Sequence, residues 1–357
     1  MLRIQKVCLM ISAAAIFTAC KKDKDPIIVI PPSEGSTITI NGLVASEAGS
    51  SAGNSVYIDL SADKQTAIER KSWDLKFYNG NEFRVKLNNT TSAGAKVLSK
   101  TDLAAVGSAD TAGLTLAVSQ MAPAPEHYAF FDALNGSLSG TVIPEISATA
   151  SENKVVIINR GTGGGVAARP WIKIKITRNG SNGYTLQYGE LNATTFQTLN
   201  ITKNADYLFQ LVSFDNGILT SGEPEKNNWD FVWSYSLYET NFGGTMVPYN
   251  FSDLIFINKL AGVTAGVVLT SAVTYETYSK DNVATTTFSN EYNVIGHKWR
   301  VTSPSSEFPG APVGVLTDRF FVVKDAAGNV YKLRFLNFHA NDGGERGKPK
   351  IEYKLVQ

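Results

Sequence analysis

The sequence contains Lys71-Ser72-Trp73-Asp74-Leu75 in its first half and Asn227-Asn228-Trp229-Asp230-Phe231 in its second. After each Trp-Asp pair come an apolar strand-like run, a turn with glycine and alanine, and a second apolar run. The aligned runs are 83–87 with 253–257, and 93–97 with 261–263. A period of about 160 residues is the length of a whole domain and far exceeds a solenoid unit. The sequence therefore predicts two copies of one domain, residues 37–193 and 194–357, joined near 192–198.

The two Trp-Asp pairs have two interpretations. Trp is a large buried anchor, and an Asp beside it on a strand faces the other way, where it can accept backbone or tyrosine hydrogens. In the first interpretation the pair is a folding landmark that recurs because the domain recurs. In the second, Trp73 or Trp229 stacks against a ligand.

The composition favours sheet over helix. The chain is 43% hydrophobic and only 18% charged, with many β-branched and aromatic residues. Apolar and polar residues alternate in several runs, such as 172–176, where isoleucines alternate with lysines. A period of two is typical of half-buried antiparallel strands. We therefore predict an all-β protein of two tandem antiparallel β-sheet domains, with few short helices, near 100–105 and 224–228.

The first residues predict export and a lipid anchor. Arg3 and Lys6 precede an apolar run over 7–17, which is too short to span a bilayer but suits a signal-peptide core. The run ends in small residues before Cys20, which resembles a bacterial lipobox and implies removal of residues 1–19 and acylation of the Cys20 thiol. The alternative is an ordinary secretory signal that leaves a free cysteine. The charged and proline-bearing residues 20–36 predict a solvated tether. The expected location is the outer membrane, on the cell surface or in the periplasmic leaflet.

Few residues suggest catalysis. The formal charge of +1 and the lack of a basic stripe argue against nucleic-acid binding. The three histidines are not spaced with Asp, Glu or Cys as metal ligands, and no Gly-x-Ser-x-Gly motif is present. The glycine-rich residues 160–165 lack the Lys-Ser/Thr of a phosphate-binding loop, so we expect a hairpin turn there. The sequence favours a binding protein over an enzyme.

Several of these runs resemble the HmuY family of haem-binding lipoproteins of bacterial surfaces. The residues that carry the resemblance are Trp73-Asp74-Leu75, the runs 83–87, 93–97 and 100–103, and the C-terminal runs 318–329 and 331–335. It covers nearly the whole mature chain, as two tandem HmuY-like domains. The resemblance implies an all-β fold, capture of haem b at the cell surface, and its transfer to a TonB-dependent outer-membrane receptor.

The resemblance also implies where haem ligands should lie. Family members hold the iron between two side chains, His in some and Met in others. The first ligand is expected after the 100–103 run, where this chain has Met121 and His127. In the second domain His297 lies close to the expected position, whereas Met246 is on the wrong side of the domain pattern.

The second ligand of each domain is harder to place. The segments where it is expected, 138–153 and 301–308, contain neither His nor Met. One ligand from each domain, with haem between them, is another arrangement. Each of His127, Met121 and His297 also has a structural interpretation, as a loop or packing residue.

We therefore predict a lipid-anchored haem-binding protein, with haem, the membrane and an outer-membrane receptor as partners. The alternative is a non-enzymatic surface binding or adhesion module that keeps the fold, has lost the haem ligands, and binds glycan, peptide or a protein partner.

Overall fold

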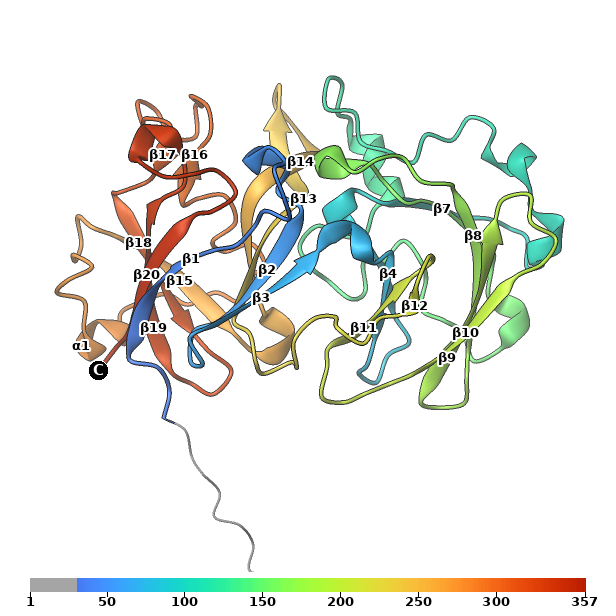
Figure 1. Ribbon diagram of the computed structural model, residues 1–357, viewed down its shortest axis with the longest axis horizontal. Coiled ribbons are helices and arrows are strands. Elements are labelled where there is room, and N and C mark those ends of the chain that lie inside the picture. Colours follow the sequence, from blue (N-terminus) through green and yellow to red (C-terminus); the bar gives the residue numbers. More distant parts are fainter. Residues whose placement is uncertain (1–30) are drawn as a thin grey trace, which may run out of the picture. The chain divides into compact units, whose positions relative to one another are not determined.

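Antiparallel β-sheet accounts for most of the regular structure in the computed structural model, which describes residues 31–357 (Figure 1). The prediction of an all-β fold with few short helices is confirmed. The predicted signal peptide, Cys20 and most of the tether lie outside the described residues. The last two residues assigned to the tether, Gly35 and Ser36, already belong to the first strand. No helix among residues 31–357 is long and apolar enough to cross a membrane.

One continuous segment, residues 75–218, forms two of the sheets, and we call it the central module. Its first sheet has the strand order β10-β9-β8-β7-β6, and its second has the order β12-β11-β4-β5. The strands are β4 (Leu75–Tyr78), β5 (Val85–Leu87), β6 (Gly94–Val97), β7 (Val156–Asn159), β8 (Ile172–Arg178), β9 (Gly183–Glu190), β10 (Gln197–Thr202), β11 (Phe209–Ser213) and β12 (Gly217–Ile218).

The two ends of the chain together form the other two large sheets, and we call this the flanking module. Its sheets have the orders β1-β20-β19-β18-β15 and β3-β2-β13-β14, and Figure 1 shows the blue strands β2 and β3 beside the yellow β13. The strands are β1 (Gly35–Thr39), β2 (Asn54–Asp59), β3 (Lys64–Glu69), β13 (Phe231–Phe242), β14 (Thr245–Ile257), β15 (Thr264–Leu269), β18 (Arg319–Lys324), β19 (Val330–Asn337) and β20 (Lys350–Leu355). A small extra sheet pairs β16 (Arg300–Val301) with β17 (Gly314–Val315).

The two modules are circular permutations of each other. Strand for strand, β10, β11 and β12 stand in the central module where β1, β2 and β3 stand in the flanking module. The first three strands of each sequence copy therefore complete the sheets of the other copy: β1 pairs with β20 and β2 with β13, while β11 pairs with β4. Hydrogen bonding thus crosses the predicted boundary between 193 and 194 in both directions, and residues 32–357 form one compact unit. The boundary remains a prediction about the sequence repeat.

The Trp-Asp pairs hold the exchanged strands. Asp74 accepts the backbone N–H of Phe214 at 2.8 Å, and Asp230 accepts that of Leu60 at 2.7 Å. Phe214 follows β11 and Leu60 follows β2, so each Asp bonds the strand contributed by the other copy. The expectation that these Asp side chains accept backbone hydrogens is confirmed.

The alignment of the copies needs a correction of two residues in one place. The turn between the two apolar runs ends at equivalent positions, Ala93 and Val263, because their N–H groups bond to the carbonyls of Asn88 and Asn258 at 3.1 and 3.2 Å. The sequence alignment had instead placed Ala93 with Ala261. That alignment matched the Ala-Gly dipeptides at 93–94 and 261–262. In the structure the left-handed residue of the turn is Ser92 in one copy and Gly262 in the other, so these dipeptides are not equivalent.

Burial on both faces is the main departure from the predicted half-buried strands. In β8 the isoleucines are buried as expected, but Lys173 is also buried and donates to the carbonyl of Val106 at 2.6 Å. In β2 the whole run from Ser55 to Asp59 is buried. The second face is covered because the sheets stack, or because loops fold over them.

Three apolar clusters account for this stacking. One lies within each module, between its two large sheets; Val56 and Ile58 belong to the flanking one and Leu75 and Phe77 to the central one. The third cluster joins the modules, between β3-β2-β13-β14 and β12-β11-β4-β5, and includes Trp73 and Trp229. We call this contact the seam.

Helices are short and mark connections. One α-helix, α1 (Lys280–Val283), lies in the described residues, and the others are 3-10 turns. A turn occupies 224–228, where a short helix had been expected, because the run is too short to propagate one. The 3-10 turns are η1 (Gly49–Ser51), η2 (Arg70–Ser72), η3 (Asn89–Thr91), η4 (Leu103–Ala105), η5 (Ser108–Thr111), η6 (Pro125–Phe130), η7 (Ala150–Glu152), η8 (Gly163–Gly165), η9 (Lys259–Ala261) and η10 (Ala340–Asp342).

Candidate functional site

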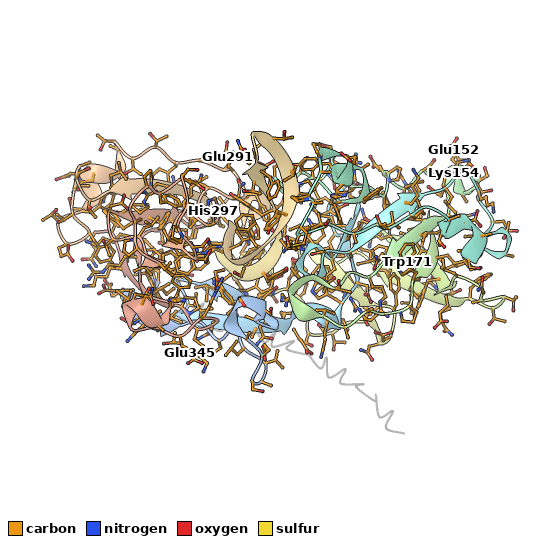
Figure 2. The ribbon with its side chains drawn as sticks, turned by 90° about the horizontal axis from the view of Figure 1, so that it is seen from above. Glu152, Lys154, Trp171, Glu291, His297 and Glu345 are labelled. Atoms are coloured by element: carbon orange, nitrogen blue, oxygen red, sulfur yellow. The ribbon has the colours of Figure 1, made fainter. Side chains whose placement is uncertain are left out.

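His297 lies beside the long hairpin of β13 and β14 (Figure 2). Its neighbour Gly296 exchanges two backbone hydrogen bonds of 3.0 Å with Ile255 of β14, which fixes the segment against the sheet. Gly296 has φ +53°, and a Cβ there would approach the hydroxyl of Tyr238 to 2.9 Å. A glycine before His297 is therefore what allows this close approach.

The imidazole of His297 sits in an aromatic setting. Its ring centroid is 5.4 Å from that of Tyr238, 5.7 Å from that of Phe251 and 6.1 Å from that of Phe308. Burial lowers the pKa of His297, and the nearby Glu307 opposes this only in part. The ring is therefore neutral at neutral pH, the form that binds metals.

The two ring nitrogens of His297 differ. Nε2 makes a 2.8 Å hydrogen bond with a carboxylate oxygen of Glu307, whose side chain is half exposed. Nδ1 is buried and has no hydrogen-bond partner among the described residues. Burial also raises the pKa of Tyr238 to about 12, so its hydroxyl remains protonated.

A surface groove of about 500 Å³ brings Met246 to the same place as His297. Met246 lies on β14 near the Gly243-Gly244 turn, and 47% of its surface is exposed. Both side chains line the groove, together with Tyr238 and Tyr292. The volume falls within the range of about 300–1,000 Å³ that is usual for small-molecule sites.

Charged side chains of both signs line this groove. Lys259 and Lys298 supply two positive charges, and Glu239, Glu291 and Glu307 supply three negative ones. Glu291 and His297, both labelled in Figure 2, line this same groove. The groove therefore offers cationic groups for a ligand's carboxylates, but its own net charge does not attract an anion.

The other two candidate ligands lie elsewhere on the fold. Met121 is 91% exposed on the loop before η6. His127 is in η6, where its Nδ1 accepts the backbone N–H of Ala124 at 3.2 Å and its ring lies 6.4 Å from Phe130. Neither is among the residues that line the groove of His297, and their role as ligands remains a prediction.

The sequence pattern argued against Met246 as a haem ligand, but the structure places it on the same groove as His297. Met246 and His297 are 51 positions apart, and only the length of the hairpin brings them to one groove. The Gly243-Gly244 dipeptide was the one available signal, because it predicts a tight turn that exposes the strand ends beside it. Nothing in the spacing indicated that His297 would lie against that hairpin.

The glycine-rich residues 160–165 are not a phosphate site. The carbonyls of Gly163 and Gly164 accept hydrogen bonds of 3.2 and 3.1 Å from the buried guanidinium of Arg70. A phosphate cradle would need N–H groups pointing at the ligand. The loop connects the neighbouring strands β7 and β8, in line with the expected hairpin turn.

Comparison with known proteins gives one family match. The family model described as HmuY protein matches residues 51–353, in a single span that includes both sequence copies. Among solved structures, the crystal structure of a Tannerella forsythia apo HmuY analog is similar, with 10% identity over 90% of this chain and 96% of that one and a TM-score of 0.21. No curated protein matches the chain.

Proposed function

The chain belongs to the HmuY family, and we propose that it is a haem-binding lipoprotein of the outer membrane that passes haem to an outer-membrane receptor. The observation that carries the proposal, beside the family, is that His297 and Met246 line the same groove, which is of ligand size. Imidazole and thioether are both established axial ligands of haem iron.

The groove supplies the groups that a porphyrin cargo needs. The aromatic rings of Tyr238 and Tyr292 provide flat apolar surface for the macrocycle, and Lys259 and Lys298 can pair with its two propionates. The neutral His297 provides an imidazole nitrogen, and Met246 a thioether that favours reduced iron. Binding through Nε2 requires release of Glu307, which costs little because that carboxylate is half exposed.

The proposed location rests on the sequence. Acylation at Cys20 would hold the described residues at the outer membrane through the short segment before β1. Delivery to a TonB-dependent receptor is part of the proposal, supported by membership of a family of binding proteins, and the proposal assigns no catalytic activity. Globomycin inhibition of signal cleavage, followed by gel mobility, tests the anchor: a wild-type chain that still matures normally would exclude lipidation at Cys20.

The haem proposal is tested by titrating haem into the chain from Lys21 onward under oxidising and reducing conditions, following the Soret band. We expect a saturable shift that H297A and M246A each weaken at least tenfold. M121A and H127A serve as comparison variants, and loss of the shift in either would move the site to the η6 segment. The absence of a shift in both redox states would contradict haem binding and favour a glycan, peptide or protein ligand.

A further inference from the structure

The seam between the two modules holds a second cavity, of about 80 Å³, which shares Lys259 and Tyr292 with the groove of His297 and is otherwise lined by other residues. It lies in the third apolar cluster, where Trp73 and Trp229 both contribute to its wall. A water molecule takes about 30 Å³ in the liquid, so the cavity suits a ligand of a few heavy atoms. Cavities between modules are common places for small-molecule sites.

Equivalent positions of the two copies line this cavity. Trp73 matches Trp229, Leu87 matches Ile257, and Thr90 matches Leu260. Equivalent positions of both copies therefore contribute to the cavity, and the residue of one copy shows what the fold accepts at the matching position of the other.

The two halves of the lining differ in charge. Where the first copy has Lys76 and Lys86, the second copy has Val232 and Phe256 at the same positions, and all four line the cavity. Since apolar residues satisfy the fold at these positions, folding does not require a lysine there. Lys86 is only 7% exposed, and burying a charge is costly unless something compensates it. Lys76 already pairs with Glu223 at 2.8 Å, so it is Lys86 that indicates a ligand of opposite charge.

Partial compensation of Lys86 comes from the protein. Its ammonium donates to the carbonyl of Ser137 at 3.2 Å, and the buried Asp132 acts on it through space. The oxygens of Asp132 accept the N–H groups of Leu87 and Val142 at 2.8 and 2.9 Å, and among the described residues Asp132 makes no hydrogen bond with the Lys86 ammonium, which has three N–H donors. Lys86 therefore keeps unused donor capacity toward the cavity.

The opposite end of the cavity carries a carboxylate. One oxygen of Glu223 accepts from the Lys76 ammonium at 2.8 Å and from the Tyr57 hydroxyl at 3.3 Å. Glu223 is only 4% exposed. Its other oxygen, Oε2, is buried and has no hydrogen-bond partner among the described residues. A buried acceptor of this kind requires a donor from a ligand or solvent.

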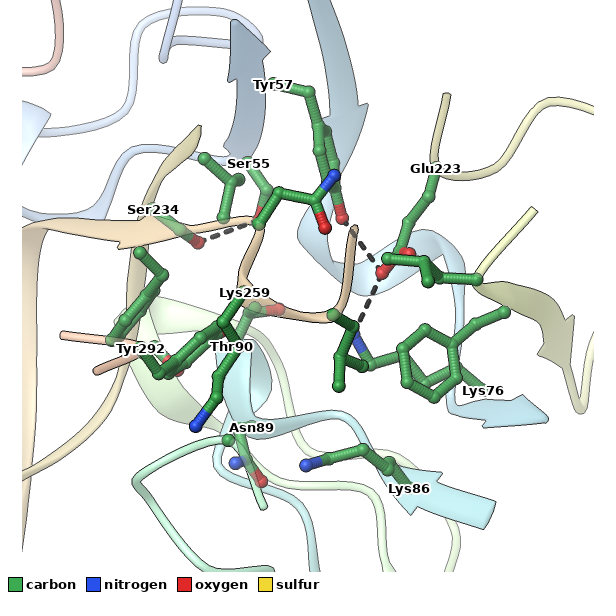
Figure 3. A pocket seen from close by; sticks show the side chains of 18 of the residues that line it. Ser55, Tyr57, Lys76, Lys86, Asn89, Thr90, Glu223, Ser234, Lys259 and Tyr292 are labelled. Atoms are coloured by element: carbon green, nitrogen blue, oxygen red, sulfur yellow. Dashed lines mark hydrogen bonds and ion pairs between the residues drawn. The ribbon is translucent and has the colours of Figure 1, made fainter. Parts of the chain in front are cut away.

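Figure 3 shows these two ends apart, with Tyr57, Glu223 and Lys76 on one side and Lys86, Asn89 and Lys259 on the other. Trp229 is 6% exposed, and its indole Nε1, a donor, also lacks a partner among residues 31–357. The same holds for the side-chain oxygens of Asn89 and Asn258, both of which line the cavity. The lining thus offers unused acceptors as well as unused donors.

We propose that the seam cavity binds a small zwitterion of amino-acid size, with its carboxylate toward Lys86 and Lys259 and its ammonium toward Glu223 Oε2. A simple anion would leave the Glu223 oxygen unpaired, and a simple amine would leave the lysines unpaired. A zwitterion satisfies both ends, and its short carbon segment would lie between the two indoles.

Calorimetric titration of the intact chain tests the proposal. The probes are glycine, β-alanine and 4-aminobutyrate, which differ in charge separation, with propionate and propylamine as analogues that carry one charge. We expect saturable binding of at least one amino acid, and at least tenfold weaker binding of both analogues. K86F, which installs the residue of the second copy, and E223Q are each expected to weaken the amino acid at least tenfold. K154F, at an exposed lysine, is the matched control and should bind as the wild type does.

Binding of propionate as strong as that of the amino acids would overturn the zwitterion assignment, and the absence of heat with every probe would overturn the site. Circular dichroism checks the fold of K86F, and E223Q decides the question if K86F does not fold. Lys86 and Glu223 do not line the groove of His297, so haem titration of the same variants separates failure of this site from failure of the haem proposal.

Discussion

Asn88 and Asn258 make the same pair of hydrogen bonds in the two sequence copies. Asn88 donates to the carbonyls of Trp73 and Arg70 at 2.7 and 2.8 Å, and Asn258 donates to those of Trp229 and Lys226 at 2.9 and 2.8 Å. Each amide thus ties the end of one strand pair to the Trp-Asp segment before it. This relation, more than the Trp-Asp pair itself, defines the repeated unit.

Replacing Asn88 by alanine should lower the free energy of unfolding by about 2–4 kcal/mol, because two buried carbonyls lose their donor. Urea denaturation measures the change. Asn182 is exposed, so N182A should change stability by less than about 0.5 kcal/mol. Equal stability of N88A and the wild type would show that the two hydrogen bonds are not needed.

Asp230 should make stability depend on pH. Burial, with Asp59 and Asp325 nearby, raises its pKa to about 8. The unfolded carboxyl ionises near its ordinary pKa of 3.8, so the unfolded state binds fewer protons between these values. The free energy of unfolding should therefore fall as pH rises from about 4 to about 8, by on the order of 5 kcal/mol for this one group.

The variant D230N should remove this contribution, because an amide does not titrate and still accepts the N–H of Leu60. Urea midpoints at several pH values compare it with the wild type and with D206N, at an exposed Asp. Parallel pH profiles for D230N and the wild type would contradict the prediction.

Lys86 should have the opposite effect at higher pH. Burial lowers its pKa from 10.5 to about 8, so the unfolded state binds more protons between these values. The free energy of unfolding should rise across pH 8 to 10.5 by on the order of 3 kcal/mol from this group. K86F lacks this contribution. The free energy of unfolding of the wild type should therefore rise relative to that of K86F as the pH increases from 8 to 10.5.

Glu307 should oppose haem binding. Its carboxylate occupies Nε2 of His297 and adds negative charge to the groove. E307A should therefore bind haem several-fold tighter than the wild type in the Soret titration. E291A removes a charge from the same groove without touching His297 Nε2, so the gain of E307A over E291A measures release of the imidazole. An E307A affinity below that of E291A would mean that Glu307 assists the ligand.

The circular permutation predicts which fragments fold. Residues 70–226 contain every strand of the central module, whereas 194–357 would lack β1, β2 and β3 and would carry β10 and β11 without β9 and β4, the strands with which they pair. The first fragment should unfold cooperatively in urea, and the second should not. Cooperative unfolding of 194–357 would instead favour the tandem boundary taken from the repeat.

The sequence was sufficient for the fold class, because alternation and β-branched composition are local properties of the chain. It also revealed the repeat, since Trp73 and Trp229 are rare residues in matching surroundings. It could not reveal the exchange of strands, because β1 has equal reason in its sequence to pair with β9 or β20. The shared groove of Met246 and His297 could not be predicted for a similar reason. Tertiary packing places both residues on it, and no rule of sequence spacing predicts that packing.

Pairing of β1 with β20 also sets an order for folding. Along the chain β1, β2 and β3 come before the central module, whereas β13 and β20, which pair with β2 and β1, come after it. The central module can close while these three early strands still have open edges, which are prone to pair with other chains. The exposed edge of β1 is therefore covered only once β20 has been made, and a chain interrupted before residue 350 would have a folded central module and a β1 strand free to pair with other chains.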